Sequence, residues 1–237
     1  AVIGVDPVAE MRDACAANLE AAEATNPWFD RSFVELREGN ALELPIEDGG
    51  VDVAAQNCLF NIFEERELER ALAEMYRVLK PQGRLVLSDP IAPVELPAAL
   101  RADQRLRAMC LSGALPYERY VELLVKTGFG TLEIRARRPY RMLDPKRFPV
   151  DAPILLESVE VAAVKEPVPA DGACVFTGRT AIYFGEDDAF DDGAGHLLAR
   201  DQPFPVCDKT AAKFEALGRD DLRVTGSTWF YDGGGCC

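Results

Sequence analysis

Short apolar runs alternate with amphipathic segments through the first half of the chain, and this alternation restricts the fold more than any other feature. The apolar runs predict buried strands at 1–5, 33–38, 51–55 and 84–88. Apolar residues at helical spacing predict helices at 8–25, 64–79, 96–109 and 117–127. Strands that alternate with helices of this length are typical of βαβ crossovers. The pattern therefore predicts an α/β protein with a doubly wound, largely parallel sheet.

The rhythm changes in the second half of the chain. Longer apolar stretches predict strands at 154–165 and 173–184, and one more short helix is predicted at 208–217. We place a domain boundary near residue 145, between a sheet domain at 1–145 and a smaller α+β region at 146–237.

Four predicted strands end at polar side chains: Asp6, Asn40, Asn57 and Asp89. Small ligands bind at the carboxyl ends of the strands in open α/β sheets, so these residues are candidates for a nucleotide site. An acidic residue at such a strand end can accept hydrogen bonds from both hydroxyls of a ribose. The alternative is that Asp6 only caps the helix that follows it.

The position of Asp6 carries a further expectation. In nucleotide-binding sheets, a glycine-rich turn follows the first strand and the ribose-binding acid comes about 20 residues later. Asp6 is the sixth residue of this chain. If it is the ribose-binding acid, the first strand and the glycine loop lie upstream, and the chain is an N-terminally truncated piece.

Charge and cysteine content exclude several classes of function. The chain has 26 basic and 40 acidic residues, a formal net charge of −14, which disfavours nucleic acid and anionic membranes as partners. No apolar run reaches the roughly 20 residues of a membrane helix. The seven cysteines are odd in number and irregularly spaced, which argues against a secreted disulfide framework. We therefore expect free or metal-binding thiols in a reducing cytoplasm.

Several segments resemble the class I S-adenosylmethionine-dependent methyltransferases. These segments are Val5-Asp6, Gly39-Asn40-Ala41, 52–57 and 77–85. The resemblance implies a Rossmann-like methyltransferase sheet and S-adenosylmethionine as the cofactor.

Other segments carry a narrower resemblance, to arsenite methyltransferases. They are 56–62, 88–90 and 109–115, and the first and the third each contain a cysteine of the kind that this family uses in arsenic methylation. Further matches at 135–143, 152–157 and 171–183, with the Gly-Gly-Gly-Cys-Cys end, resemble the branch assigned to arsenosugar biosynthesis. The resemblance covers essentially the whole chain and implies a role in arsenic detoxification or arsenosugar synthesis.

The resemblance assigns roles to individual residues. Cys58 and Cys110 would be the catalytic, arsenic-binding thiols. Residues that would bind the cofactor are Asp6 and Pro7 at the ribose, Asn40 and Ala41 at the adenine, and Asn57 near the methionine. Better-known relatives have a further arsenic-binding cysteine, at a position where this chain has Ser158. The missing ligand would come from Cys174, Cys207, Cys236 or Cys237, or the site uses fewer thiols.

Thiols suit this chemistry because trivalent arsenic is soft and prefers soft sulfur ligands. Its lone pair can attack a sulfonium methyl without losing a proton, so no general base is required. A chain with one histidine, His196, is compatible with that. The implied partners are arsenite, presented as a thiol adduct, and a thiol reductant; the oligomeric state is left open.

Two other functions remain in view. The first is a methyltransferase of the same fold that acts on a small organic substrate such as a quinone or sterol. The second is a non-enzymatic, thiol-rich protein that binds zinc through Cys207, Cys236 and Cys237, although regular spacing such as Cys-x-x-Cys is absent. Cys15, on the apolar face of a predicted helix, is expected to be a core residue.

Overall fold

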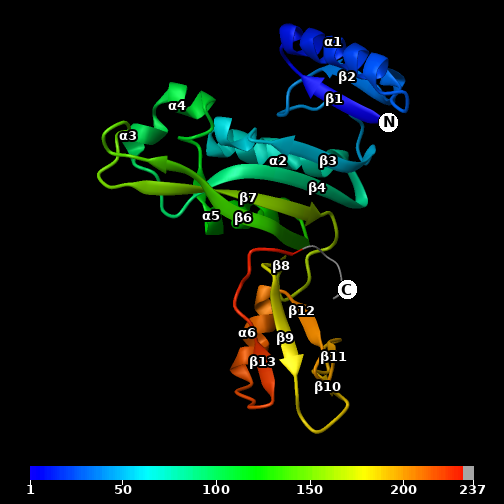
Figure 1. Cartoon of the computed structure of the whole chain (residues 1–237), viewed down its shortest axis with the longest axis vertical. Helices are drawn as coiled ribbons and strands as arrows, with labels where there is room; N and C mark the ends of the chain where they lie inside the picture. Colours follow the sequence, from blue (N-terminus) through cyan, green and yellow to red (C-terminus); the bar gives the residue numbers. More distant parts are fainter. Residues whose placement is uncertain (232–237) are drawn as a thin grey trace.

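The computed structural model describes residues 1–231 of the chain. Figure 1 draws their arrangement. The strands are β1 (Val2–Asp6), β2 (Val34–Glu38), β3 (Val51–Asn57), β4 (Leu79–Ala92), β5 (Leu115–Pro116), β6 (Thr131–Leu143), β7 (Ile154–Val164), β8 (Cys174–Phe176), β9 (Arg179–Tyr183), β10 (Ala189–Asp191), β11 (Leu197–Ala199), β12 (Pro203–Val206) and β13 (Leu222–Val224).

The helices are mostly short. No helix within residues 1–231 is long and apolar enough to cross a membrane. The α-helices are α1 (Ala9–Thr25), α2 (Glu65–Val78), α3 (Ala98–Arg101), α4 (Gln104–Ala108), α5 (Tyr117–Thr127) and α6 (Asp208–Ala216), and the 3-10 helices are η1 (Arg31–Phe33) and η2 (Phe60–Ile62).

The central sheet has six strands, in the order β3-β4-β7-β6-β8 with β5 added on β4. β3 and β4 run parallel, whereas β7 is antiparallel to both of its neighbours, β4 and β6. The prediction of a doubly wound, largely parallel sheet is therefore wrong for the half of the sheet that contains β7, which runs antiparallel to β4 and β6. The loop at 144–153 contains no crossover helix, so the chain turns back and β7 pairs antiparallel with β6. The fold is α/β with a mixed central sheet.

β1 and β2 form a separate parallel pair, in register from Val2 opposite Val34 to Asp6 opposite Glu38. The predicted helix between them is confirmed as α1. Figure 1 shows this unit, in blue, beside β3. Among the described residues, β1 pairs only with β2 and β3 pairs only with β4, so each has one unpaired edge.

α2 and α5 pack together against the central sheet. The helical spacing of Leu68, Leu72 and Met75 predicted a buried face on α2, and all three side chains are buried. A capping box at Glu64 begins the helix. Gly128 ends α5 in the left-handed conformation, with φ 115°, as its position in the sequence indicated. Both helix predictions are confirmed.

Two predicted elements are interrupted. The helix expected at 96–109 is two short helices, α3 and α4, because Asp103 lies between them. Its Oδ1 accepts hydrogen bonds from the backbone N of Arg105 at 2.9 Å and of Leu106 at 3.0 Å, which starts a new helix. The strand expected at 173–184 is divided into β8 and β9 at Gly178, whose φ of 80° is incompatible with an extended strand.

The C-terminal region contains a three-stranded antiparallel sheet, β12-β9-β13, and the β10-β11 hairpin. α6 packs on this sheet, and a core that includes Tyr183, Leu198, Val206 and Phe214 lies there. The boundary that we placed near residue 145 falls between β6 and β7, which pair within the central sheet.

Candidate functional site

Asp6 ends β1, and Pro7 follows it in the turn to α1. Oδ1 of Asp6 accepts a hydrogen bond from the backbone N of Val8 at 2.8 Å, so one carboxylate oxygen caps the turn. The Arg12 guanidinium donates to the backbone O of Asp6 at 2.8 Å and to Glu38 at 2.9 Å, which ties α1 to β1 and β2. Oδ2 of Asp6 has no hydrogen-bond partner within residues 1–231 and can accept one from a ligand.

Asn40 and Ala41 follow β2 in the segment 39–50, which we call the Asn40 segment. Oδ1 of Asn40 accepts a hydrogen bond from the backbone N of Leu42 at 2.9 Å. This bond turns the chain away from β2. Asn40 itself is exposed, and Ala41 is half-buried.

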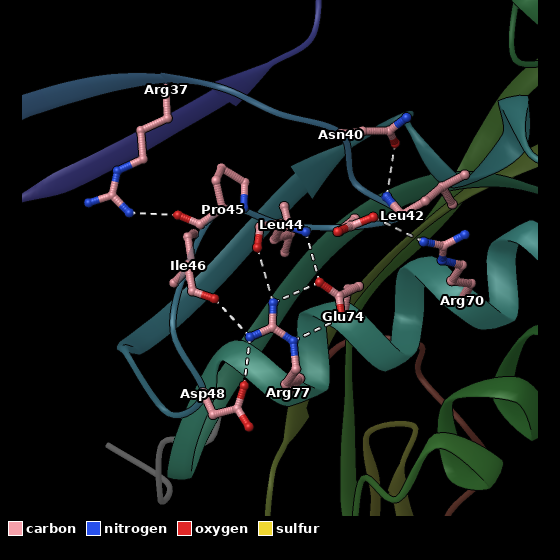
Figure 2. A network of polar contacts seen from close by, with 11 residues as sticks. Arg37, Asn40, Leu42, Leu44, Pro45, Ile46, Asp48, Arg70, Glu74 and Arg77 are labelled. Atoms are coloured by element: carbon pink, nitrogen blue, oxygen red, sulfur yellow. Dashed lines mark hydrogen bonds and ion pairs between the residues drawn. The ribbon is translucent and has the colours of Figure 1, made fainter.

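A network centred on Arg77 of α2 holds the Asn40 segment in place (Figure 2). The guanidinium donates to two backbone oxygens of the segment, at 2.8 and 3.1 Å, and pairs with Asp48 at 2.7 Å. Glu74 accepts a hydrogen bond from the backbone N of Leu44 at 2.7 Å. Its ion pair with Arg77 holds the pKa of Glu74 below its usual range. The network therefore fixes the segment that follows β2, and with it the β1-β2 unit, to α2, which packs on the central sheet.

Asn57 is the last residue of β3 and lies opposite Ser88 of β4. The backbone N of Cys58 donates to the backbone O of Ser88 at 2.8 Å, so pairing continues one residue beyond the strand. Asn57 is exposed and Cys58 is half-buried. Both therefore lie at the carboxyl end of β3, where a ligand of an α/β sheet binds.

Cys58 and Cys110 lie together although 52 positions separate them in the sequence. The Sγ of Cys110 donates to the backbone O of Cys58 at 2.7 Å, and Cys110 lies close enough to raise the pKa of the Cys58 thiol. Cys58 follows β3 and Cys110 follows α4. We call these two residues the thiol pair.

Both members of the thiol pair have a strained backbone. Cys58 has a φ of 59° and Cys110 a φ of 57°, in the left-handed region that favours glycine. The surrounding packing holds them there, because a Cβ added at Gly113 would overlap the backbone of Asn61. That close contact joins the turn after Cys110 to the turn after Cys58. Strain of this kind, about 1–3 kcal/mol per residue, persists in folded proteins mainly at functional sites.

A buried network behind Cys58 was not predicted. The Tyr120 hydroxyl donates to Oδ2 of Asp89 at 2.6 Å, and Nε2 of Gln56 donates to the same oxygen. Oε1 of Gln56 accepts a hydrogen bond from the backbone N of Leu59 at 2.9 Å. Gln56 thus connects a buried carboxylate to the turn that contains Cys58. The strand-end pattern singled out Asp89, but nothing in the sequence pairs it with Gln56.

Burial sets the protonation of this site. Burial raises the pKa of Asp89 to about 6, although the hydrogen bonds from Tyr120 and Gln56 lower it. Burial also raises the pKa of Cys58 to about 12, with further contributions from Cys110 and from the Asp89 charge. Cys58 is therefore a neutral thiol near pH 7, and a ligand that binds its sulfur must displace a proton.

Cys174 and Cys207 lie away from the thiol pair. Cys174 begins β8, and Cys207 precedes α6, which packs on β8. β8 and β3 are opposite edges of the central sheet, four strand spacings or about 19 Å apart. Cys15, expected to be a core residue, is only half-buried on α1, a helix that has no fully buried residue.

The remaining positions considered for a third arsenic ligand are Ser158, Cys236 and Cys237. Ser158 of β7 lies with its Oγ 3.5 Å from the Oγ of Ser88, the residue whose backbone O accepts from the backbone N of Cys58. Cys236 and Cys237 lie outside the described residues. Within residues 1–231, no three His, Cys, Asp or Glu side chains are grouped in a way that could hold a metal ion.

An open cavity of about 450 Å³ adjoins the carboxyl end of β3 and the facing part of β4. It lies on the sheet and includes both Asn57 and its neighbour Ser88. Its lining residues are Ala55, Gln56, Asn57, Val86, Leu87, Ser88, Arg135, Glu160 and Val161.

The strand-end residues fit the adenosine part of S-adenosylmethionine. The unpartnered Oδ2 of Asp6 is an acceptor for a ribose hydroxyl, and the exposed amide of Asn40 can meet an adenine. Both groups follow strands that are in register with each other. These groups have the hydrogen-bonding chemistry that a nucleoside would need.

Comparison with known proteins finds relatives over most of the chain. A family model described as a methyltransferase domain matches residues 1–87. The chain is 30% identical over 220 residues to an arsenite methyltransferase of Aquipseudomonas alcaligenes, a match that covers 88% of this chain and 61% of that protein. An arsenite methyltransferase of Halobacterium salinarum is 32% identical over 133 residues, 56% of this chain and 32% of that protein. The chain thus spans about three-fifths of the first relative and a third of the second.

A solved structure has the same fold. It is that of an arsenic(III) S-adenosylmethionine methyltransferase from Chlamydomonas reinhardtii, which superposes with a TM-score of 0.60 at 22% identity over 96% of this chain and 77% of that one. The methyltransferase family implies S-adenosylmethionine as the cofactor. The chain is therefore similar in sequence to arsenite methyltransferases over most of its length, carries a methyltransferase domain at 1–87, and has the mixed α/β fold of that solved structure.

Proposed function

We propose that the protein transfers the methyl group of S-adenosylmethionine to trivalent arsenic that is bound by Cys58 and Cys110. The observation that supports this most is the thiol pair itself. Two cysteines from distant segments touch each other at the carboxyl end of β3, next to the expected cofactor site. Two adjacent thiols form a chelating site for a soft, thiophilic ion.

Arsenic binding at this pair needs no base. Each thiol replaces one hydroxide of arsenous acid and the hydroxide leaves as water with the thiol proton, so a raised pKa of Cys58 does not prevent the exchange. In this proposal a third sulfur comes from a small thiol partner or from Cys236 or Cys237, because the other cysteines of residues 1–231 lie on α1, β8 and before α6. The arsenic lone pair then remains free for bond formation.

The chain contributes mainly by positioning. The strained turns at Cys58 and Cys110 and the link from Gln56 to the turn fix the two sulfurs, and therefore the direction of the arsenic lone pair. Holding two reactants in line can contribute roughly 7–11 kcal/mol. No side chain has to take a proton from the nucleophile, which agrees with the place of the only histidine, His196, in the separate β10-β11 hairpin.

The cofactor supplies an electrophilic methyl group on a sulfonium. In this proposal Asp6, with Pro7 in the same turn, holds the ribose, and the Asn40 segment holds the adenine through Asn40 and Ala41. Asn57 lies at the methionine part. The Arg77 network keeps the adenine side of the site at a fixed distance from the thiol pair.

A further strand with a glycine-rich turn completes the cofactor site in this proposal. β1 and β3 each have one unpaired edge among the described residues, and an isolated two-stranded pair is marginally stable. A parallel strand between them would join the two sheets and bring its turn to the carboxyl ends of both.

The biological setting is part of the same proposal. The five described cysteines are all free, which suits a reducing compartment, and we assign the protein to the cytoplasm. There it would serve arsenic detoxification or arsenosugar synthesis, with arsenite delivered as a thiol adduct.

The test is methyl transfer to arsenite by the full-length protein, with a small thiol and radiolabelled cofactor. We expect labelled methylarsenicals, and we expect Cys58→Ser and Cys110→Ser each to lower the rate by on the order of 10²-fold because arsenic loses a ligand. Cys15→Ser is the matched control, since Cys15 is also half-buried and lies on α1. Absence of labelled methylarsenicals, or full activity of the variant lacking both thiols, would refute the proposal.

A further inference from the structure

A second pair of cysteines lies at the junction between β8 and α6. Cys174 is the first residue of β8, and Cys207 is the N-cap of α6. Cys207 lies close enough to raise the pKa of the Cys174 thiol, and the Lys209 ammonium lies close enough to lower it. Both cysteines are free.

The junction is held by bonds that flank the two cysteines. Lys209, two residues after Cys207, donates to the backbone O of Gly172 at 2.5 Å and to Asp171 at 2.6 Å, two and three residues before Cys174. On the other side, the backbone N of Cys174 donates to Gly130 at 2.8 Å. These bonds hold the start of β8, with Cys174, against the start of α6, with Cys207.

Burial favours the neutral thiol of Cys174 over its thiolate. Cys207 is 3% exposed, and its Sγ lies 3.3 Å from the Oγ1 of Thr210. Burial raises the pKa of Cys174, and Lys209 only partly opposes this. Thiol-disulfide exchange requires a thiolate. A half-buried Cys174 thiol with a raised pKa is therefore poorly suited to that chemistry and, beside the buried Cys207, better suited to binding a thiophilic centre that releases water.

We propose that Cys174 and Cys207 form a second binding site, for a trivalent arsenical with two exchangeable hydroxyl groups. Each thiol forms an As–S bond, one As–O bond breaks for each, and two waters leave with the two thiol protons and the two hydroxides. Arsenic stays trivalent, so no oxidant or reductant is consumed. The choice of arsenic as the ligand follows from the proposed function, whereas the existence of a dithiol site does not.

This site is separate from the thiol pair. Cys174 lies opposite Thr131 of β6, at one edge of the central sheet, and Cys58 follows β3 at the other edge. The sheet spans about 19 Å between these edges, so one arsenic atom cannot be bound by both pairs. The second site can therefore hold arsenic while the first is occupied.

The test uses phenylarsine oxide, which as its hydrate has two exchangeable hydroxyls, and the full chain with Cys58, Cys110, Cys236 and Cys237 replaced by serine. Intact-protein mass spectrometry in excess 2-mercaptoethanol should detect one bound phenylarsenic and two fewer free thiols. Adding Cys174→Ser should abolish the binding, and adding Cys15→Ser should leave it unchanged. Circular dichroism should give the same fold for all variants.

Three results would overturn the inference. They are no binding by the folded four-serine variant, binding that survives Cys174→Ser, and loss of binding with Cys15→Ser. Diphenylarsinous acid, with one exchangeable hydroxyl, should be removed by excess 2-mercaptoethanol, and equal retention of both arsenicals would also contradict chelation. This experiment measures binding and not methyl transfer. If binding fails while the unaltered enzyme methylates arsenite, only the second site is refuted and the proposed function stands.

Discussion

At the scale of single residues, the site depends on groups whose partners come from other strands. Gln56 and Asp89 lie on neighbouring strands, β3 and β4, and Tyr120 comes from α5. Together they place a buried carboxyl group directly behind the turn that contains Cys58. The same carboxyl group makes the stability of the fold depend on pH.

The Asp89→Asn variant tests that dependence. The pKa of Asp89 is raised to about 6 in the folded protein and is about 3.9 in an unfolded chain, so the folded state favours the protonated form. The contribution of Asp89 to the free energy of unfolding is therefore full below about pH 4 and is lost as the pH rises to about 6. At about 1.4 kcal/mol per pKa unit the loss is about 3 kcal/mol. Urea unfolding at pH 4 and pH 7 should show that the unaltered protein loses this stability and that Asp89→Asn does not. An equal change in the free energy of unfolding with pH for the two proteins would contradict the prediction.

The cysteines illustrate how far the sequence can be interpreted at this scale. Cys58 and Cys110 were selected only through resemblance to a family, because no spacing rule brings together residues 52 positions apart. Their contact depends on the turns after β3 and α4. Gln56 was part of a matched segment, but its link to Asp89 follows from strand register, which the sequence does not specify. The strand-end residue Asp6 was recognisable because its position relative to a strand and a helix is local.

At the scale of elements, local patterns predicted most helices and few of the strand partners. α2, α5 and α6 are where the apolar spacing and the glycine and proline stops indicated. β7 was placed correctly, but β6 and the antiparallel pairing of the two were not predicted, because strand direction depends on the connecting loop and not on apolar content. Asp103 and Gly178 interrupt predicted elements, each through a single backbone requirement.

The Arg77→Met variant tests how the Asn40 segment is held. Arg77 donates to two backbone oxygens of the segment and pairs with Glu74 and Asp48, and hydrogen bonds that involve a charged group contribute about 1.5–3 kcal/mol. We expect faster amide hydrogen exchange over 40–48 and a free energy of unfolding lower by about 2 kcal/mol.

The control for that experiment is Arg70→Met on the same helix. Arg70 makes one exposed ion pair, at 3.4 Å to Glu43, and exposed pairs contribute roughly 0–1 kcal/mol. Hydrogen exchange and stability should therefore stay close to those of the unaltered protein. Equal effects of the two substitutions would show that the Arg77 network does not position the segment.

At the scale of the whole molecule, residues 225–231 return from the C-terminal region to the central sheet. The guanidinium of Arg137 on β6 lies 4.4 Å from the ring centre of Trp229 and 5.0 Å from that of Tyr117. The backbone N of Tyr231 donates to Ile134 of β6 at 3.0 Å. Figure 1 shows the red end of the chain rising to the central sheet at this place. These contacts connect the two parts of the protein.

The Trp229→Ala variant tests this connection. It removes a half-buried ring and a cation–π contact, so we expect the free energy of unfolding to fall by about 1–3 kcal/mol. Phe230→Ala, beside it, is the control, because that ring is 62% exposed and should change stability by less than about 0.5 kcal/mol. Chemical denaturation of the two variants gives the comparison, and a Trp229 effect no larger than that of Phe230 would contradict the connection.

The central claim is that the thiol pair binds the arsenic that is methylated. Arsenic-edge X-ray absorption tests it most directly, on the full chain with Cys174, Cys236 and Cys237 replaced by serine and loaded with arsenite in a small thiol. We predict sulfur-bound arsenic that remains with the protein after desalting and is lost when Cys58→Ser is added. Oxygen-bound arsenic, or sulfur-bound arsenic that survives Cys58→Ser, would contradict the claim.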